Sequence, residues 1–498
     1  METIHLKTVD PFGQELLRFA ATRGIELSWD RYRRQQPQDG FLRLGLSCPY
    51  GCMEGPCRID PFGRGPDRGL CGLDRDGMTA AFLLRLSLLG ALEAMDDRRP
   101  EQGLSGKTGD STLGEKGARG LEKLGGAPVT LREIDQAVLL LKRPVESPEH
   151  LIERALRLGI LTLILSEKGR PSRRALQSGR CKAGYGLLSK NHAFIGVVGQ
   201  PPQKLIASLL QKASRETSPP VQLVSLGDWI PLKDGFLPCA CTTGEAELLI
   251  SSGKIHLVLA GSRTDPSILG LCRSLNLPLV SAQEPPEAGE VLRLARSFHS
   301  GTSQTSLKAD ASMVGEGEVT ATVQELKKRF KKDGSAKIAL LGGSDTLQQP
   351  LGYLSVELAT ALRGEGQLIA AWGDAALWMI KDGLVSRKGG SPVTILDPSQ
   401  GPLMAIKALT TMGKLNDLQG VCFAGLKGCY DLAMAIGMAA LGLKVCVAVP
   451  LPLWGSENVG RVLTEKLSAT GGSLTHFDHP AQVQEIFEWF MGSSCSKP

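Results

Sequence analysis

Four cysteines within 24 residues constrain this chain more than any other feature. Residues 48–72 read CPYGCMEGPCRIDPFGRGPDRGLCG, so Cys48, Cys52 and Cys57 are closely spaced and Cys71 follows after thirteen residues. Three close thiolates and one later thiolate can surround an iron–sulfur cubane. Six glycines in the same stretch let the backbone wrap such a group without Cβ clashes. The spacing therefore favours a [4Fe-4S] cluster held in a loop.

Two other interpretations of this loop remain open. Structural zinc modules usually have two short cysteine pairs separated by a spacer, and this loop has no second pair. Ordinary buried cysteines are the other alternative. A disulfide framework is not expected, because the twelve cysteines are spread over 498 residues and the first residues, METIHLK, lack the order of a signal peptide. We expect a reducing, cytoplasmic setting.

The composition excludes several classes of protein. An apolar share of 42% is too high for a disordered chain or a collagen-like fibre. A formal net charge of +6 is too small for this length to indicate nucleic-acid binding. The chain has no uninterrupted apolar run of the ~18 residues needed for a membrane span. The length allows roughly two to four domains.

The order of apolar runs and glycine turns predicts an α/β fold. Short apolar runs followed by Gly turns and helical patterns predict strands over 194–198, 337–341, 368–372 and 421–424. Helices are expected over 80–95 and from 149 to about 158, before Gly159. We predict an N-terminal helical iron–sulfur head followed by two Rossmann-like parallel-sheet domains. The expected ranges are 1–100 for the head, 101–190 for a linker and short helical region, and 191–335 and 336–498 for the two domains.

The residues around the cysteines resemble those of a known family. RYRRQQPQ at 31–38, GLSC at 45–48 and GPCRIDPFG at 55–63 are similar to the anaerobic nickel–iron carbon monoxide dehydrogenases, which belong with the hybrid-cluster (prismane) proteins. The resemblance implies a prismane-like fold. It also implies that the four cysteines of the loop hold the family's [4Fe-4S] B-cluster. Three residues rather than two separate the first pair of cysteines, a difference that one extra turn residue absorbs.

The chain departs from this family at its other metal centres. Asp39 and Ser47 stand where the family has the cysteines of a D-cluster that bridges two subunits. At the positions of the nickel-containing C-cluster only Cys429 is still a cysteine, so we expect both clusters, and nickel, to be absent. Strand ends in this architecture line ligand clefts. A degenerate cleft is therefore expected from Gln200, Asp228, Ser262, Ser344, Asp374 and Cys429, although polar turn residues would give the same pattern.

These features favour a redox protein that transfers electrons through one [4Fe-4S] cluster. Its partner would be a ferredoxin-like electron carrier or a subunit of another metalloenzyme, and formation of a homodimer is left open. One alternative is a divergent oxidoreductase that converts CO and water to CO2 with electrons passed to ferredoxin, or acts on another small substrate. A scaffold or regulatory subunit is the other alternative. Cys239 and Cys241, two residues apart, could form a second metal or redox pair.

Overall fold

The structure is a computed structural model that divides into two compact units, each described here by itself. Unit 1 combines Met1–Gln35, Ala175–Glu325 and Ser344–Pro398, and unit 2 combines Gln36–Arg174, Leu326–Gly343 and Ser399–Pro498. The residues that the structure describes are 6–35, 40–96, 124, 128–142, 147–168, 179–215, 219–301, 307–332, 337–385, 392–398, 401–426, 428–453, 455–477 and 482–492.

Unit 1 is built on a mostly parallel sheet. Its strands are β1 (Gly179–Ala183), β2 (Ala193–Val198), β3 (Val221–Leu226), β4 (Pro231–Leu232), β5 (Gly235–Phe236), β6 (Cys239–Cys241), β7 (Leu257–Ala260), β8 (Leu279–Ser281), β9 (Gly315–Thr320), β11 (Leu368–Ala371) and β12 (Val393–Leu396). The order within this unit is β11-β12-β9-β1-β6-β3-β2-β7-β8. Neighbours along this path run parallel except β1 and β9. The short strands β4 and β5 form an antiparallel pair.

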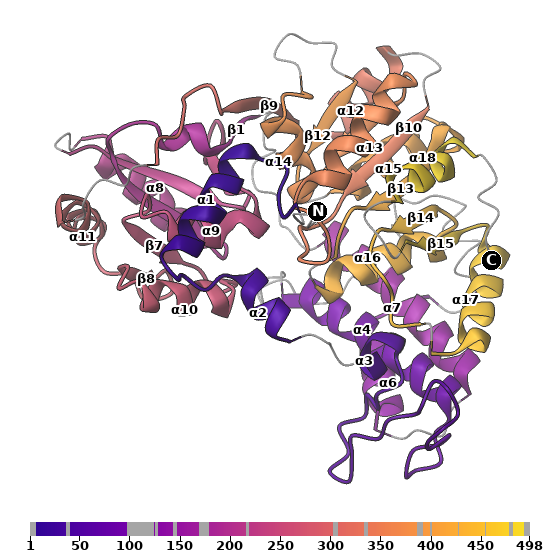
Figure 1. The fold of residues 1–498 in the computed structure, drawn as a ribbon. Helices are drawn as coiled ribbons and strands as arrows, with labels where there is room; N and C mark the ends of the chain where they lie inside the picture. The colour runs from indigo at the N-terminus through magenta and orange to yellow at the C-terminus, as the bar shows by residue number, and fades with distance from the viewer. Residues whose placement is uncertain are drawn as a thin grey trace, which may run out of the picture. The chain divides into compact units, whose positions relative to one another are not determined.

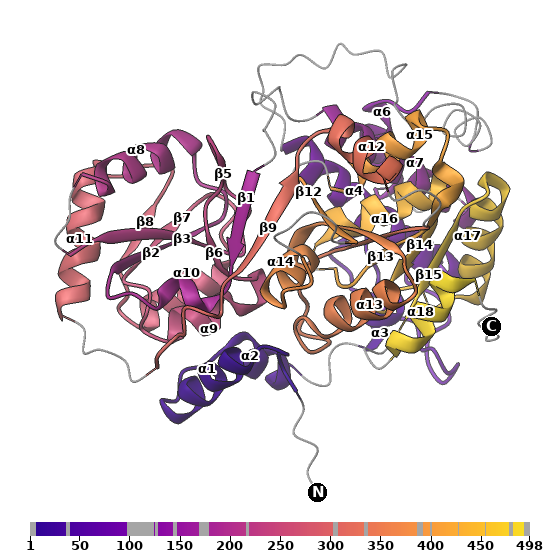
Figure 2. The ribbon, with the colours of Figure 1, turned by 90° about the horizontal axis from the view of Figure 1, so that it is seen from above.

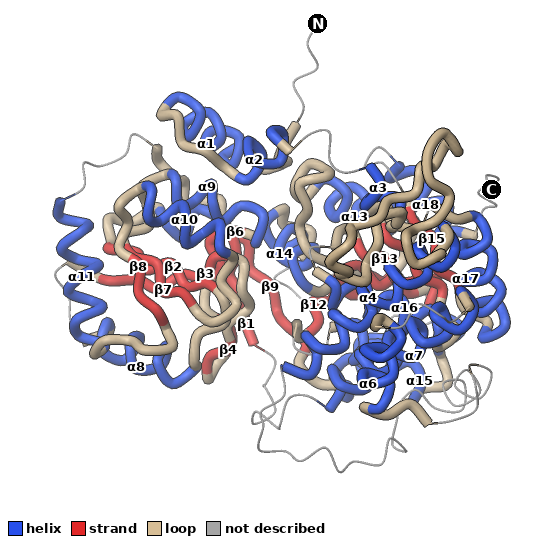
Figure 3. The backbone as a smooth tube through the Cα atoms, turned by 90° about the horizontal axis from the view of Figure 1, so that it is seen from below, coloured by secondary structure: helices blue, strands red, loops and turns tan. Residues whose placement is uncertain are grey.

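Helices cover both faces of strands β2, β3, β7 and β8, as Figures 2 and 3 show. The helices of unit 1 are α1 (Pro11–Thr22), α2 (Ser28–Arg34), α8 (Gln203–Ala213), α9 (Ala246–Ser251), α10 (Pro266–Ser274), α11 (Ala288–Gly301), α13 (Tyr353–Gly364) and α14 (Gly373–Lys381), with 3-10 turns η1 (Tyr185–Leu188) and η2 (Thr243–Glu245). One apolar core joins the sheet to α8 and α11. A second core joins it to α1, α9 and α10.

The first helix of the chain therefore belongs with the sheet of unit 1. Asp10 starts α1 by accepting hydrogen bonds from the backbone N–H groups of Phe12 and Gly13 at 2.9 and 3.1 Å. Phe12 and Leu16 then lie in the same apolar core as α9. Thr8 also forms a parallel bridge with Leu351. Burial of this apolar face explains why the first 35 residues group with unit 1, whereas the range expected for the head, 1–100, follows chain order.

Unit 2 combines a helical bundle with a four-stranded parallel sheet. Its helices are α3 (Gly40–Leu44), α4 (Arg75–Asp96), α6 (Arg132–Leu140), α7 (Pro148–Lys168), α15 (Pro402–Thr411), α16 (Cys429–Ala440), α17 (Glu457–Thr470) and α18 (Val483–Met491), with most of α12 (Val323–Lys332) and the turn η3 (Leu415–Asp417). Its strands are β10 (Ile338–Gly342), β13 (Leu418–Phe423), β14 (Lys444–Val447) and β15 (Ser473–His476). They pair in the order β10-β13-β14-β15.

Helix α4 is the apolar centre of the bundle. It packs against α7 and α16, as Figure 1 shows. Among the described residues it alone is long and apolar enough to cross a membrane by length and composition, and 61% of its apolar window is buried. Packing within unit 2 accounts for that apolar character, as it does in the core helices of many folded proteins.

The predicted α/β class is confirmed, and the four predicted strands correspond to β2, β10, β11 and β13. The helix expected over 80–95 is α4. The helix expected to stop at Gly159 was placed too short, because α7 continues to Lys168. A Cβ on Gly159 would lie 2.6 Å from the backbone nitrogen of Gly437 in α16, so this glycine permits close helix packing and is not a helix stop. The expected linker around 100–127 lies almost entirely outside the described residues.

Candidate metal centre and strand-end residues

Backbone contacts in unit 2 bring separate parts of the cysteine loop together. The backbone N–H of Cys48 donates to the carbonyl of Cys57 at 2.9 Å, beside an antiparallel bridge between Ser47 and Arg58. The backbone N–H of Leu70 lies 3.4 Å from Cys57 Sγ, which brings the segment before Cys71 against the third cysteine. Residues far apart in the loop thus face one another.

Electrostatics within the loop also indicate that the thiols lie close together. Burial raises the pKa of the Cys48 thiol, and a backbone hydrogen bond at Tyr50 opposes the rise. Cys57, Cys71 and Cys52 each raise this pKa further, because a second negative thiolate nearby is unfavourable. Four cysteine side chains in one loop are the usual ligand set of a [4Fe-4S] cubane, whose irons bind them as thiolates. The donor set fits a cubane.

Turn residues set the path of the loop. Gly51, Gly63 and Gly72 have positive φ values of 65°, 68° and 85°, a region that side chains disfavour. The Asp60 carboxylate accepts a hydrogen bond from the backbone N–H of Phe62 at 3.3 Å and a second one from the backbone N–H of Arg64. These local bonds hold the loop in shape between its cysteines.

The cysteine loop is open to solvent on the surface of unit 2. Cys52 and Cys71 are exposed, whereas Cys48 and Cys57 are partly buried. Three large apolar side chains of the same loop are also exposed: Met53 is 97% exposed, Phe62 77% and Leu70 75%. A group held here would lie near the surface, where a partner protein can reach it.

The predicted cleft residues divide between the two units. Cys429 is the first residue of α16 in unit 2, while the other five belong to unit 1. Gln200 and Ser262 are exposed turn residues. The Asp228 carboxylate accepts a hydrogen bond from the backbone N–H of Gly199 at 2.5 Å, which is the role of a turn residue. Ser344 is partly buried. These positions offer amide and oxygen side chains in place of thiolates.

Backbone contacts fill the end of the sheet near Gln200. A Cβ added to Gly261 would lie 2.0 Å from the carbonyl oxygen of Gly199, and one added to Gly227 would lie 2.5 Å from the backbone nitrogen of Thr243. The turns after β2 and β7 are therefore packed backbone against backbone, as are the turns after β3 and β6. The Asp228 side chain links the β3 turn to the β2 turn.

Asp374 is the one predicted cleft residue of unit 1 that joins a buried polar network. It lies at the start of α14, is 5% exposed, and accepts three hydrogen bonds. Sequence reasoning missed its partners, namely Thr242, Thr243, Glu245, Asp345 and Lys381. A signal for part of the network was present, because Thr242 and Glu245 have the spacing of a capping box, which they form. Thr243 is 131 positions from Asp374 and Asp345 is 29, while Lys381 is 136 positions from its partner Glu245.

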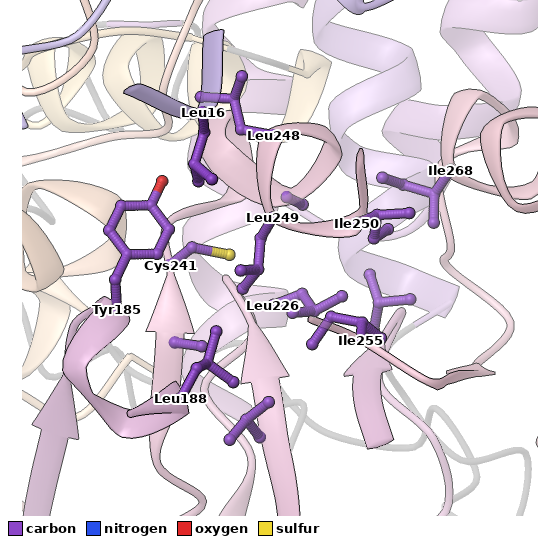
Figure 4. Packing of buried hydrophobic residues seen from close by; sticks show 14 of the residues in the cluster. Leu16, Tyr185, Leu188, Leu226, Cys241, Leu248, Leu249, Ile250, Ile255 and Ile268 are labelled. Carbon is purple, nitrogen blue, oxygen red and sulfur yellow. The ribbon is translucent and has the colours of Figure 1, made fainter. Parts of the chain in front are cut away.

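Cys239 and Cys241 lie in the buried sheet of unit 1. Cys239 Sγ donates to the carbonyl oxygen of Cys241 at 3.0 Å, and burial raises the pKa of Cys239 to about 12. Burial also raises the pKa of Cys241 well above its usual value, and Figure 4 shows its side chain between Tyr185 and Leu249. Burial thus favours the neutral thiol at both positions. The second metal or redox pair stays a prediction.

No three His, Cys, Asp or Glu side chains gather as ligands of a single ion within the described ranges. The ligands of a cubane bind different irons and stand farther apart than the ligands of one ion. Ser47 and Asp39 stand at the expected D-cluster positions. Ser47 is 7% exposed, and its hydroxyl has no hydrogen-bond partner among the described residues. Asp39 lies outside those residues.

Comparison with known proteins identifies relatives of part of the sequence. No family model matches the chain. Carbon monoxide dehydrogenase 1 of Methanosarcina mazei is 45% identical over 98 residues, which cover 20% of this chain and 15% of that protein. Carbon monoxide dehydrogenase 1 of Carboxydothermus hydrogenoformans is 51% identical over 84 residues, covering 17% and 13%. The chain thus matches only about a seventh of the length of these curated relatives.

Solved structures extend the similarity to the whole fold. Carbon monoxide dehydrogenase IV from Carboxydothermus hydrogenoformans superposes with a TM-score of 0.80 at 19% identity, covering 98% of this chain and 99% of that chain. A nickel-free carbon monoxide dehydrogenase from Thermococcus sp. AM4 gives 0.79 at 19% identity, covering 98% and 97%. The predicted resemblance is confirmed: about a fifth of the chain is similar in sequence to carbon monoxide dehydrogenases, and the chain has their α/β fold.

Proposed function

We propose that this relative of the carbon monoxide dehydrogenases is a one-cluster electron-transfer protein. The observation that carries the proposal is a contrast between two places in the chain. In unit 2 Cys48, Cys52, Cys57 and Cys71 lie in one loop, in which the Cys48 backbone bonds to Cys57 and the Leu70 N–H reaches Cys57 Sγ. In unit 1 the strand-end residues are oxygen and amide groups, and Asp228 and Asp374 already accept hydrogen bonds from the protein. The first set suits a cubane and the second does not.

The four cysteines of the loop would hold the [4Fe-4S] cluster. When bound, such a cluster accepts and releases single electrons. The chain's own groups would tune that chemistry, because the Leu70 N–H points at the sulfur of Cys57 at 3.4 Å, and N–H···S bonds stabilise the reduced state of a cluster. Cys52 and Cys71 are on the solvent side.

The exposed apolar side chains of the loop support a docking role. Met53, Phe62 and Leu70 surround the cysteines and are at least three-quarters exposed. Exposed apolar groups of this size are typical of contact surfaces. We propose that they receive a ferredoxin-like electron carrier or a subunit of another metalloenzyme. A cytoplasmic location is part of the same proposal.

Metal analysis of anaerobically purified protein tests the proposal. We expect about four irons per chain, the content of one cubane, with neither zinc nor nickel in stoichiometric amount. Stoichiometric zinc in place of iron would favour the zinc interpretation of the loop. Stoichiometric nickel, or reduction of a dye that depends on CO, would overturn the proposal in favour of a catalytic oxidoreductase.

Two cysteine variants locate the iron. Cys57→Ser should lose the iron and the visible absorption of the cluster, because a serine hydroxyl is a poor substitute for a thiolate ligand. Cys429→Ser is the matched control, since Cys429 is the cysteine retained at a C-cluster position, and it should keep all four irons. Loss of iron from the Cys429 variant, or retention by the Cys57 variant, would contradict the assignment of ligands.

A further inference from the structure

A buried network in unit 1 contains more carboxyl groups than cations. Glu245 is fully buried, and its two carboxylate oxygens lie 2.7 and 2.6 Å from Lys381 Nζ. Lys381 Nζ also lies 2.9 Å from the carboxylate of Asp10. Asp345 and Asp374 add two further carboxyl groups, joined to Glu245 through threonine hydroxyls and backbone groups. Four carboxyl groups thus share one lysine within the network.

Asp374 needs both of its oxygens as hydrogen-bond acceptors. Its Oδ1 accepts from the backbone N–H of Thr243 at 3.2 Å. Its Oδ2 accepts from the Thr243 hydroxyl at 2.5 Å and from the backbone N–H of Asp345 at 2.8 Å. Three donors face this side chain, and the ionised carboxylate is the form that accepts from all of them.

Asp345, unlike Asp374, has only one oxygen with a donor of its own. Trp378 Nε1–H donates to Asp345 Oδ1 at 2.9 Å. The other oxygen, Oδ2, is in close contact with the Thr242 hydroxyl, which also lies 3.2 Å from Glu245 Oε2. A hydroxyl has one proton and cannot donate to two carboxylates at once. One of these two oxygens must therefore carry a proton, or the contact becomes a repulsion between lone pairs.

The surroundings decide which carboxyl group holds that proton. Glu245 is paired with Lys381, whose positive charge favours the ionised form of its partner. Asp345 has no such cation among its closest described neighbours, and the charged groups that face it are Asp374 and Glu245. Burial and the adjacent Asp374 raise the pKa of Asp345 to about 8. Asp345 is thus the group that keeps its proton at neutral pH.

We propose that Asp345 is a neutral carboxylic acid in the folded protein, and that it starts a proton-ordered chain of hydrogen bonds fastening three segments of unit 1. Asp345 Oδ2–H donates to Thr242 Oγ1, and Thr242 Oγ1–H donates to Glu245 Oε2. The chain links the turn before α13 to the end of β6, and Asp374 links both to the start of α14. This inference does not depend on whether the cysteine loop holds iron.

The stability that this hydrogen-bonded chain contributes depends on pH between about 4 and 8. When Asp345 loses its proton, the hydrogen bond to Thr242 is lost and a second negative charge appears beside Asp374. The folded state binds this proton up to about pH 8, whereas an unfolded aspartate releases it near its ordinary value of 3.8. Stability contributed by the protonated form is therefore present at low pH and declines as pH rises through this interval.

Asparagine is a close structural substitute for the neutral acid. In Asp345→Asn the Oδ1 can still accept from Trp378, and the Nδ2 can donate to Thr242 without any proton to lose. Asp374→Asn is the matched control. Its amide would direct N–H groups at a donor, because both oxygens of Asp374 now accept. The two substitutions are chemically identical but should have opposite consequences.

The experiment measures urea unfolding of unit 1 between pH 6 and pH 9, with alkylation of the buried Cys241 thiol, read by mass spectrometry, as the signal. We expect Asp345→Asn to fold, and the ratio of the wild-type unfolding constant to that of the variant to rise about tenfold per pH unit, levelling off above pH 8. Asp374→Asn should be destabilised across the whole range. The infrared carbonyl band of a protonated carboxyl group should be present in the wild type at pH 7 and absent from Asp345→Asn.

The inference would be overturned if the unfolding constants of the wild type and Asp345→Asn changed with pH in the same way, or if Asp345→Asn failed to fold. An infrared carbonyl band that is the same in the two proteins would also overturn it. Iron content is measured on the same samples. Because the network and the cysteine loop belong to different units, iron should be equal in all three proteins. An absence of iron from the wild type would count against the proposed function and leave this test unaffected.

Discussion

Replacement of Lys381 by methionine gives a quantitative test of the network. The lysine side chain is 6% exposed and its main partner, Glu245, is fully buried. Its ammonium group also lies 4.5 Å from the ring centre of Tyr185 and 4.2 Å from that of Trp378. Removing one member of a buried ion pair typically costs about 3–5 kcal/mol, because the remaining charge loses its partner. Since the carboxylate of Asp10 is 17% exposed, we expect Lys381→Met to cost about 3 kcal/mol at pH 7.5.

The pH dependence of this variant carries the mechanistic information. Burial is the largest influence on Glu245 and raises its pKa, whereas Lys381 lowers it. Without the lysine the pKa of Glu245 rises further, so this carboxyl group should become neutral at mildly acidic pH. The cost of Lys381→Met should therefore shrink when the pH falls from 7.5 to 5.

Urea unfolding, followed by alkylation of the buried Cys241 thiol, measures the cost in unit 1. Lys407→Met is the matched control, because Lys407 is 42% exposed and lies 3.5 Å from Glu167. An exposed pair of this kind contributes about 0–1 kcal/mol. If Lys381→Met is no more destabilising than the control at pH 7.5, or if its cost does not depend on pH, the reasoning about the buried charges is wrong.

Two further predictions concern other parts of the fold. Gly159→Ala should destabilise the bundle of unit 2 by about 1–3 kcal/mol in urea unfolding, because the new Cβ would lie 2.6 Å from the Gly437 nitrogen. Gly270→Ala is the control, because a Cβ there would have no atom within 4 Å. It should be neutral or stabilising by up to about 1 kcal/mol. Burial lowers the pKa of His256 to about 4, and its Nδ1 accepts a hydrogen bond from the Phe194 N–H at 2.9 Å. Because the unfolded state binds the proton more readily, stability should fall by up to about 3 kcal/mol between pH 6.5 and pH 4, and urea midpoints of His256→Asn should depend less on pH in this range.

Local patterns predicted the elements of this fold better than their grouping. The apolar run at 194–198 is a buried strand, β2, because continuous apolar side chains are what both covered faces of a parallel sheet require. The end of α7 was misjudged because a glycine in a helical pattern has two physical meanings. At Gly159 it permits contact with α16, and no local signal distinguishes that from a helix stop.

The cysteine loop and the network around Asp345 also differ in how far the sequence could predict them. The cysteine loop could be selected from sequence because its four cysteines and its turns lie within 24 residues, and their role as ligands stays a prediction. The network around Asp345 could not, because its hydrogen bonds join residues that are 103 and 131 positions apart. Of that network only Asp374 was selected, and it was selected for its place after a strand. Its actual role, accepting hydrogen bonds from two other segments, depends on pairings that only the folded chain creates.

The uneven similarity to the carbon monoxide dehydrogenases has a physical reason in these two kinds of site. A loop that binds a cluster needs particular residues at particular spacings, because a serine hydroxyl is a poor substitute for a thiolate ligand and a residue such as Gly63 holds a positive φ. A buried strand such as β2 needs only apolar side chains of suitable size, so its sequence can change while the sheet is kept. A fold can therefore persist at low identity around a short, closely similar loop. The strand-end residues Asp228 and Asp374 accept backbone hydrogen bonds, a role that polar turn residues fill in many folds and that needs only a short acceptor at that place. Such a role constrains the sequence less than the cysteine spacing and the positive-φ glycines of the loop do.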